Sequence, residues 1–188
     1  MTRIIAGHVG GRRLRTPAGD GTRPTSERVR EALLAKLEHD LGSFAGRHVL
    51  DLFAGSGALG LEAASRGAHE VVLVEAVPAV ARIAADNARQ LGLAQVRVRQ
   101  GKVAAVLTGA DPANRFDLVV ADPPYDLPEP GLAAMLLSLT RPAWLQPGAV
   151  VVLERSRRSP QPTWAPGLVE VDQRTYGDTR VWFARYDE

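Results

Sequence analysis

Three acidic residues, Asp51, Glu75 and Asp122, each follow a short apolar run of the kind that forms a buried strand. Ligands of open α/β sheets bind beyond the carboxyl ends of the parallel strands. We therefore expect the three carboxylates to lie together at one edge of a sheet. Such a group can accept hydrogen bonds from hydroxyl or amino groups and can attract a cation.

The stretch from Asp51 to Gly60 is glycine-rich and joins a predicted strand to a predicted helix. Glycines allow close approach of the backbone to a ligand, and a helix N-terminus offers unpaired N–H groups. Gly55-x-Gly57-x-x-Gly60 matches the dinucleotide fingerprint, and Glu75 lies 20 residues after Gly55, where a carboxylate binds ribose hydroxyls. This spacing fits either a nicotinamide dinucleotide or S-adenosylmethionine.

Two features favour S-adenosylmethionine over the dinucleotide. Asp51 precedes the glycine loop, where it would repel a pyrophosphate but attract a sulfonium ligand that carries an ammonium group. The motif Asp122-Pro123-Pro124-Tyr125 has no part in hydride transfer. An NAD(P)-dependent oxidoreductase stays as an alternative, opposed also by the lack of a plausible Ser/Tyr/Lys hydride site.

From residue 47 onward, predicted strands and helices alternate. The pattern predicts a Rossmann-like, doubly wound α/β sheet of seven strands that ends in an antiparallel hairpin. The expected strands are 48–52, 71–75, 96–98, 116–121, 149–153, 168–176 and 180–186. The expected helices begin with one that Thr25 caps and Gly42 ends, followed by one ending near Arg66, then 78–91, 102–108 and 132–139.

The N-terminus is predicted to be a basic arm, residues 1–24, that precedes a main domain, residues 25–188. Short strand-like pieces at 3–6 and 12–15 predict a β-hairpin. Residues 1–30 hold seven arginines against two acids, although the whole chain has a net charge of only +2. This clustering predicts an anionic partner, most commonly a nucleic acid. The candidate contacts are Arg12, Arg13, Arg23, Arg28 and Arg30.

Composition narrows the remaining classes of protein. The chain has no cysteine, and its four histidines lack ligand spacing, so we expect no metal site. No apolar run approaches the roughly 18 residues that span a bilayer, and the first residues do not form a secretory signal. We expect a soluble, cytoplasmic monomer.

Asp51-x-Phe53-x-Gly55-x-Gly57 followed by Asp122-Pro123-Pro124-Tyr125 resembles the class I S-adenosylmethionine-dependent N-methyltransferases that act on exocyclic amines. The resemblance extends to bacterial 16S ribosomal RNA guanine-N2 methyltransferases. It is carried there by three N-terminal segments and one near the C-terminus: Arg3-Ile4-Ile5-Ala6-Gly7, Thr22-Arg23-Pro24-Thr25, Arg28 to Leu33, and Tyr176-Gly177-Asp178-Thr179. Members modify one guanine of the small subunit, so 16S rRNA or the 30S particle is the implied partner.

The resemblance also assigns roles. The Asp122 carboxylate and the Pro123 carbonyl would accept the two N–H bonds of the amine, and Tyr125 would stack on a flipped-out base. The cofactor would be bound by Asp51, Phe53, Ala54, Gly55, Gly57, Glu75 and Gln100. One departure is Gln100-Gly101-Lys102, because many related enzymes place there an acid that accepts from the adenine amino group. Adenine would then be read by Gln100 or by backbone.

Other readings remain open at this point. A DNA or protein-amine methyltransferase would use the same motif. A non-catalytic RNA-binding assembly factor would retain the arm but would not need Asp122 or Tyr125.

Overall fold

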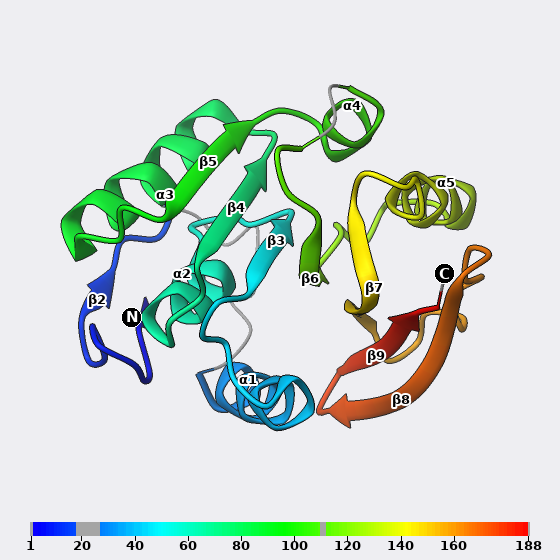
Figure 1. The fold of residues 1–188 in the computed structure, drawn as a ribbon, viewed down its shortest axis with the longest axis horizontal. Helices are drawn as coiled ribbons and strands as arrows, with labels where there is room; N and C mark the ends of the chain where they lie inside the picture. Colours follow the sequence, from blue (N-terminus) through cyan, green and yellow to red (C-terminus); the bar gives the residue numbers. More distant parts are fainter. Residues whose placement is uncertain (1, 18–26, 110–111, 188) are drawn as a thin grey trace.

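The computed structural model describes residues 2–17, 27–109 and 112–187. Its main sheet has seven strands in the order β5-β4-β3-β6-β7-β9-β8, which confirms the predicted α/β class and the closing hairpin (Figure 1). The first five pair in parallel, whereas β9 pairs antiparallel with both β7 and β8. The strands are β3 (His48–Leu52), β4 (Glu70–Glu75), β5 (Val96–Gln100), β6 (Phe116–Ala121), β7 (Leu145–Ser156), β8 (Leu168–Tyr176) and β9 (Thr179–Tyr186).

Helices cover both faces of this sheet, and each face has its own apolar core. The helices are α1 (Glu27–Leu41), α2 (Ala58–Ser65), α3 (Pro78–Leu91), α4 (Val103–Thr108) and α5 (Glu129–Leu139). The first three pack on one face and the last two on the other (Figure 1). Alternate residues of each central strand therefore enter different cores, which explains why these strands are nearly continuous apolar runs.

The two sides of the sheet meet at β3. The chain passes from β3 to β4 on one side, while β6 pairs with β3 on the other. This is the topological switch point, beyond which α/β proteins bind their ligands. Asp51 lies in β3, Glu75 ends β4, and Asp122 follows β6.

The N-terminal hairpin, β1 (Thr2–Arg3) and β2 (Arg13–Leu14), is docked on α2. The fully buried Glu62 carboxylate accepts the N–H groups of Ile5 at 2.7 Å and Ala6 at 2.8 Å. Gly7 has φ 82°, and a Cβ there would stand 2.0 Å from the carbonyl oxygen of Ser65. Only glycine fits this contact, so the turn is fixed to the end of α2.

Several predicted boundaries differ from the structure. Strand β5 ends at Gln100 instead of 98, and the hairpin strands are Thr2–Arg3 and Arg13–Leu14 instead of 3–6 and 12–15. Helix α5 begins three residues before the expected Leu132, because Pro130 and Gly131 in its first turn conceal the start. Strand β7 runs from Leu145 to Ser156 instead of 149–153, since pairing of Leu145 with Phe116 of β6 extends its start and pairing with β9 extends its end. The predicted Thr25 cap and the division between residues 24 and 25 lie outside the described residues and stay predictions.

Candidate active site

The glycine loop between β3 and α2 is held against the end of β4. Ala54 donates its N–H to the Val74 carbonyl at 2.9 Å. Phe53 adopts φ 62°, a left-handed conformation that is unusual for a bulky residue and that clusters at functional sites. The backbone of this loop is therefore held in a fixed conformation at the end of β4.

The three glycines of the loop have different roles. A Cβ on Gly60 would stand 2.3 Å from a Leu73 methyl group, and one on Gly57 would stand 2.8 Å from the other. These two glycines allow α2 to pack closely on β4. Gly55 has φ 56° and nothing within 4 Å of its Cβ position. It is the glycine that leaves open space for a ligand.

Asp51 is the buried carboxylate of the site. Its side chain is 3% exposed, and its Oδ2 accepts the Gly60 N–H at 2.9 Å. Burial, aided by the negative charges of Asp122 and Glu75, raises its pKa to about 7. A cation beside these carboxylates would stabilise the ionised form of Asp51.

Glu75 is oriented by two backbone N–H groups. Its Oε2 accepts from Gly55 at 2.9 Å and its Oε1 from Val77 at 2.8 Å. Each oxygen keeps a further lone pair for a ligand hydroxyl. Gln100 is the register partner of Glu75 on β5, so the structure places it at the same edge of the sheet.

The segment from Asp122 to Tyr125 leaves β6 beside this edge. Pro123 is buried, whereas Asp122 reaches solvent and Tyr125 is 77% exposed. Protein atoms crowd the Asp122 carboxyl, and this partial burial raises its pKa to about 6. At neutral pH the carboxylate is therefore mainly ionised and able to accept N–H bonds.

A buried ion pair behind this segment was not foreseen from the sequence. Arg155, near the end of β7, donates to Glu129 at 2.8 Å, and its side chain is 6% exposed. Glu129 opens α5 directly after the loop that follows Tyr125. The pair ties the loop that follows Tyr125 to the sheet. Alternation along β7 does place Arg155 on the face that α5 covers, together with Val151 and Leu153.

Asn87 is a second residue that sequence reasoning missed. Its side chain is 1% exposed, accepts the Arg15 N–H at 2.9 Å, and donates to the Arg15 carbonyl at 2.9 Å and the Ser56 carbonyl at 3.0 Å. One amide from α3 therefore connects the arm to the glycine loop. A buried asparagine on the core side of an amphipathic helix is the signal that could have identified it.

The arginines proposed for RNA binding fall into separate groups. Arg13 and Arg28 are exposed, and Arg12 is exposed while donating to the Gln90 carbonyl at 3.0 Å. Arg23 lies outside the described residues.

The prediction for Arg30 is corrected by its burial. Its side chain is 2% exposed and donates to the Arg3 carbonyl, and burial lowers the pKa of its guanidinium. Arg30 therefore anchors the arm to α1 and is not a surface contact. Helical spacing explains this, because Arg30 lies three residues before Leu33 on the buried face of α1.

Within the described ranges, no group of three or more His, Cys, Asp or Glu could hold a metal ion. No described helix is long and apolar enough to cross a membrane.

The sheet order and the glycine loop beside an Asp-Pro-Pro-Tyr segment define a class I methyltransferase. The structure of yhhF from Escherichia coli superimposes with a TM-score of 0.85 at 31% identity, covering 99% of this chain and 98% of that one.

Sequence comparison gives the family. The chain belongs to the family described as Conserved hypothetical protein 95, whose profile matches residues 2–185. YlbH of Bacillus subtilis (strain 168) is 34% identical over 182 residues, covering 95% of this chain and 96% of that protein. Ribosomal RNA small subunit methyltransferase D of Escherichia coli (strain K12) is 35% identical over 162 residues, covering 86% and 78% respectively.

Proposed function

We propose that this protein transfers a methyl group from S-adenosylmethionine to the exocyclic N2 amine of a guanine in 16S rRNA. The observation that carries the proposal is one edge of the sheet where Asp51 and Glu75 adjoin the Asp122–Tyr125 segment. Similarity to a protein named for methylation of small-subunit rRNA supports the substrate class.

The residues at the glycine loop fit the cofactor. Glu75 presents two oriented oxygens that suit adjacent ribose hydroxyls, and Gly55 leaves the space above it open. Asp51 supplies negative charge for a ligand whose sulfonium and ammonium are cationic, whereas a pyrophosphate would be repelled. When bound, S-adenosylmethionine supplies an activated methyl group. Gln100 lies where it can contact the adenine ring.

The substrate half of the site suits an aromatic amine. The lone pair of such an amine is delocalised into the ring, which makes it a poor nucleophile. Acceptance of its two N–H bonds by the Asp122 carboxylate and the Pro123 carbonyl would favour a pyramidal nitrogen. Proline fixes φ at Pro123 and Pro124, so the carbonyl is held rigidly. The residues thus act mainly by positioning.

Tyr125 and the arm complete the proposed RNA site. An exposed aromatic ring next to the amine acceptors is suited to stack on a flipped-out guanine. Arg12, Arg13 and Arg28 add positive charge on the arm and the start of α1. Arg23, whose position is not described, keeps its proposed role as an RNA contact.

Methyl transfer from labelled S-adenosylmethionine tests the proposal. The purified protein is incubated with 16S RNA, with 30S particles, with DNA and with ribosomal protein in separate reactions, and the methylated base is identified by nuclease digestion. We expect N2-methylguanine in the rRNA reactions only. Label in DNA or protein would contradict the substrate class, and calorimetry with S-adenosylmethionine and NADPH distinguishes the two cofactors.

Complementation distinguishes a catalytic methyltransferase from an assembly factor without catalysis. A strain that lacks the gene is given either the wild-type protein or the Asp122→Ala variant. If the Asp122→Ala variant restored methylation of the 16S rRNA guanine, the assigned role of Asp122 would be wrong.

A further inference from the structure

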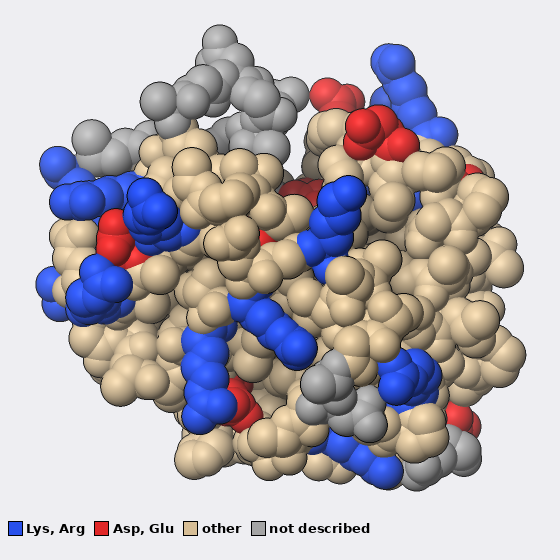
Figure 2. All heavy atoms as spheres, turned by 90° about the horizontal axis from the view of Figure 1, so that it is seen from above, with Lys and Arg blue, Asp and Glu red and all other residues tan. Residues whose placement is uncertain are grey.

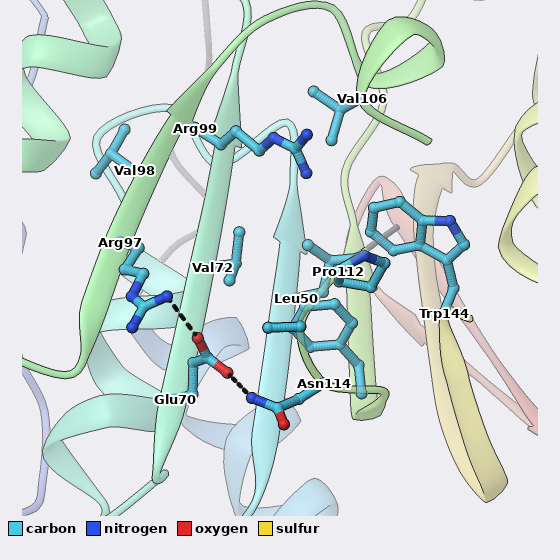
Figure 3. A pocket seen from close by; sticks show the side chains of 12 residues that line it. Leu50, Glu70, Val72, Arg97, Val98, Arg99, Val106, Pro112, Asn114 and Trp144 are labelled. Carbon is cyan, nitrogen blue, oxygen red and sulfur yellow. Dashed lines mark hydrogen bonds and ion pairs between the residues drawn. The ribbon is translucent and has the colours of Figure 1, made fainter. Parts of the chain in front are cut away.

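A pocket of about 410 Å³ lies on the α4 face of the sheet and extends from the starts of β4 and β6 to Arg99, near the end of β5. Leu50 and Val72 line the pocket on the sheet, and Trp144 lies across from Val72 (Figure 3). Phe116 also belongs to the lining. The two aromatic rings are stacked, with centroids 6.1 Å apart and planes 18° from parallel. The volume falls in the range of roughly 300–1,000 Å³ typical of ligand pockets.

The mouth of the pocket is positively charged. Arg97 and Arg99 are alternate residues of the edge strand β5, on the same face as their register partners Val72 and Val74, and so about 7 Å apart along the strand. In Figure 3 the Arg99 guanidinium extends over the pocket toward Val106. Among the described residues Arg99 has no ion pair. Figure 2 likewise shows Lys and Arg side chains exposed on one face of the molecule around a few acidic ones.

Glu70 is the one acid among the described residues that line the pocket, and its negative charge is balanced by its neighbours. Glu70 accepts from the Asn114 amide at 2.9 Å and lies 3.4 Å from the Arg97 guanidinium. His48 contacts it at 3.2 Å, and these donors, Asn114 first, lower the pKa of its carboxyl. The Arg97 side chain remains 74% exposed. The mouth therefore suits an anion, while the interior suits an apolar planar group.

We propose that this pocket binds one unpaired nucleotide of the RNA substrate, with its base against the apolar floor and its phosphates on Arg97 and Arg99. A base with flanking phosphates combines the two chemistries that the pocket offers. A smaller hollow of about 160 Å³ adjoins it and shares Glu70, Arg97 and Asn114, so the nucleic acid strand can continue along the edge of the sheet.

This contact is separate from the methyl-transfer site. Glu70 and Phe116 begin their strands, whereas Glu75 and Asp122 stand at the opposite ends. The length of β4 separates Glu70 from Glu75 by roughly 17 Å, whereas Arg99, at the other end of the pocket, is the chain neighbour of Gln100. The pocket therefore binds a nucleotide other than the methylated one. The inference rests on RNA being the substrate, as proposed above, but not on the identity of the methylated base.

Steady-state methyl transfer to 16S RNA tests the pocket with three variants. Arg99→Glu reverses the charge at the mouth, Val72→Phe fills the floor without changing charge, and Arg185→Glu is the matched control on β9, beyond β7 in the sheet. We expect Arg99→Glu to raise KM for RNA about tenfold or more and to lower the salt dependence of binding. Val72→Phe should raise KM with the salt dependence unchanged. Neither should alter kcat or cofactor affinity.

Hydrogen exchange of the wild-type protein keeps the test independent of variant folding. RNA should protect the amides of β5 and of residues 113–116, and adenosine monophosphate at millimolar concentration should protect the same segments. Arg99→Glu kinetics equal to those of Arg185→Glu would overturn the proposal. Protection by the mononucleotide but not by RNA would mean that the pocket serves a free nucleotide. A wild-type protein that transfers no methyl group to RNA would instead refute the proposed function.

Discussion

The two halves of the candidate active site are built differently. On the cofactor side, Asp51 and Glu75 accept backbone N–H groups of the loops that surround them, and Asp51 is buried. On the substrate side, Asp122 reaches solvent, and Tyr125 is 77% exposed. The proposed cofactor half is thus held by internal hydrogen bonds, while the proposed substrate half is open to solvent. Substitutions in one half should therefore change methyl transfer or cofactor affinity without changing the other.

The largest effect is expected from Asp122→Ala. It removes the acceptor for the amine without touching the glycine loop, so methyl transfer should fall about 10²- to 10³-fold while cofactor affinity changes little. Single-turnover transfer and calorimetry measure the two quantities. Asp126→Ala, an exposed acid in the same loop, is the matched control and should behave as wild type. An equal loss in both variants would mean that the loop's net charge matters and not the position of Asp122.

Asp51→Asn should act on the other half. The amide keeps an oxygen for the Gly60 N–H but loses the negative charge, so cofactor affinity should fall about 10- to 100-fold. RNA affinity should stay at the wild-type value. Calorimetry with S-adenosylmethionine and filter binding with 16S RNA give the two constants, and unchanged cofactor affinity would exclude the electrostatic role.

Asp51 also makes the stability of the cofactor-free protein depend on pH. Folding raises the pKa of this carboxyl from its ordinary 3.8 to about 7, so the folded protein holds a proton that the unfolded chain releases. The contribution of Asp51 to the free energy of unfolding is therefore complete below pH 4 and is lost as the pH rises through 7. In denaturant titrations at pH 8, Asp51→Asn should be more stable than wild type by at least about 1 kcal/mol. A difference that is the same at pH 4 and pH 8 would contradict this origin.

Tyr125→Ala should lower kcat/KM for RNA about tenfold, the loss of one base–aromatic stack. The exposed ring contributes little packing, so the melting temperature should not change. Tyr125→Phe keeps the ring and should retain most activity. If Phe were as poor as Ala, the hydroxyl and not the ring face would carry the role.

The smallest effect is expected from the arm. Arg13 is exposed, so Arg13→Ala should weaken RNA binding by only a few fold and reduce the slope of log affinity against log salt by about one. Arg30→Ala should instead reduce thermal stability, because Arg30 is buried against the arm. A large loss of RNA affinity in a fully folded Arg30→Ala protein would mean that Arg30 contacts RNA.

The local pattern predicted the elements that position the site, and long-range contacts account for what it missed. Asp51, Glu75 and Asp122 stand where apolar strands end, and parallel strands bring such ends together whatever the rest of the chain does. By contrast, the burial of Arg30 depends on an arm that returns to α1, and Arg155 is buried only because α5 starts early enough to offer Glu129. Periodicity places both side chains on covered faces, but it does not identify the partner that each one contacts.

The Asn87 amide links the arm, the proposed RNA contact, to the glycine loop, the proposed cofactor contact. It bonds to Arg15 in the arm and to Ser56 in the glycine loop, so a displacement of one is transmitted to the other through a single rigid group. We expect RNA on the arm to change cofactor affinity, and thermodynamic reciprocity then requires the cofactor to change RNA affinity by the same factor. The coupling between the two sites would in that case depend on one side chain of α3.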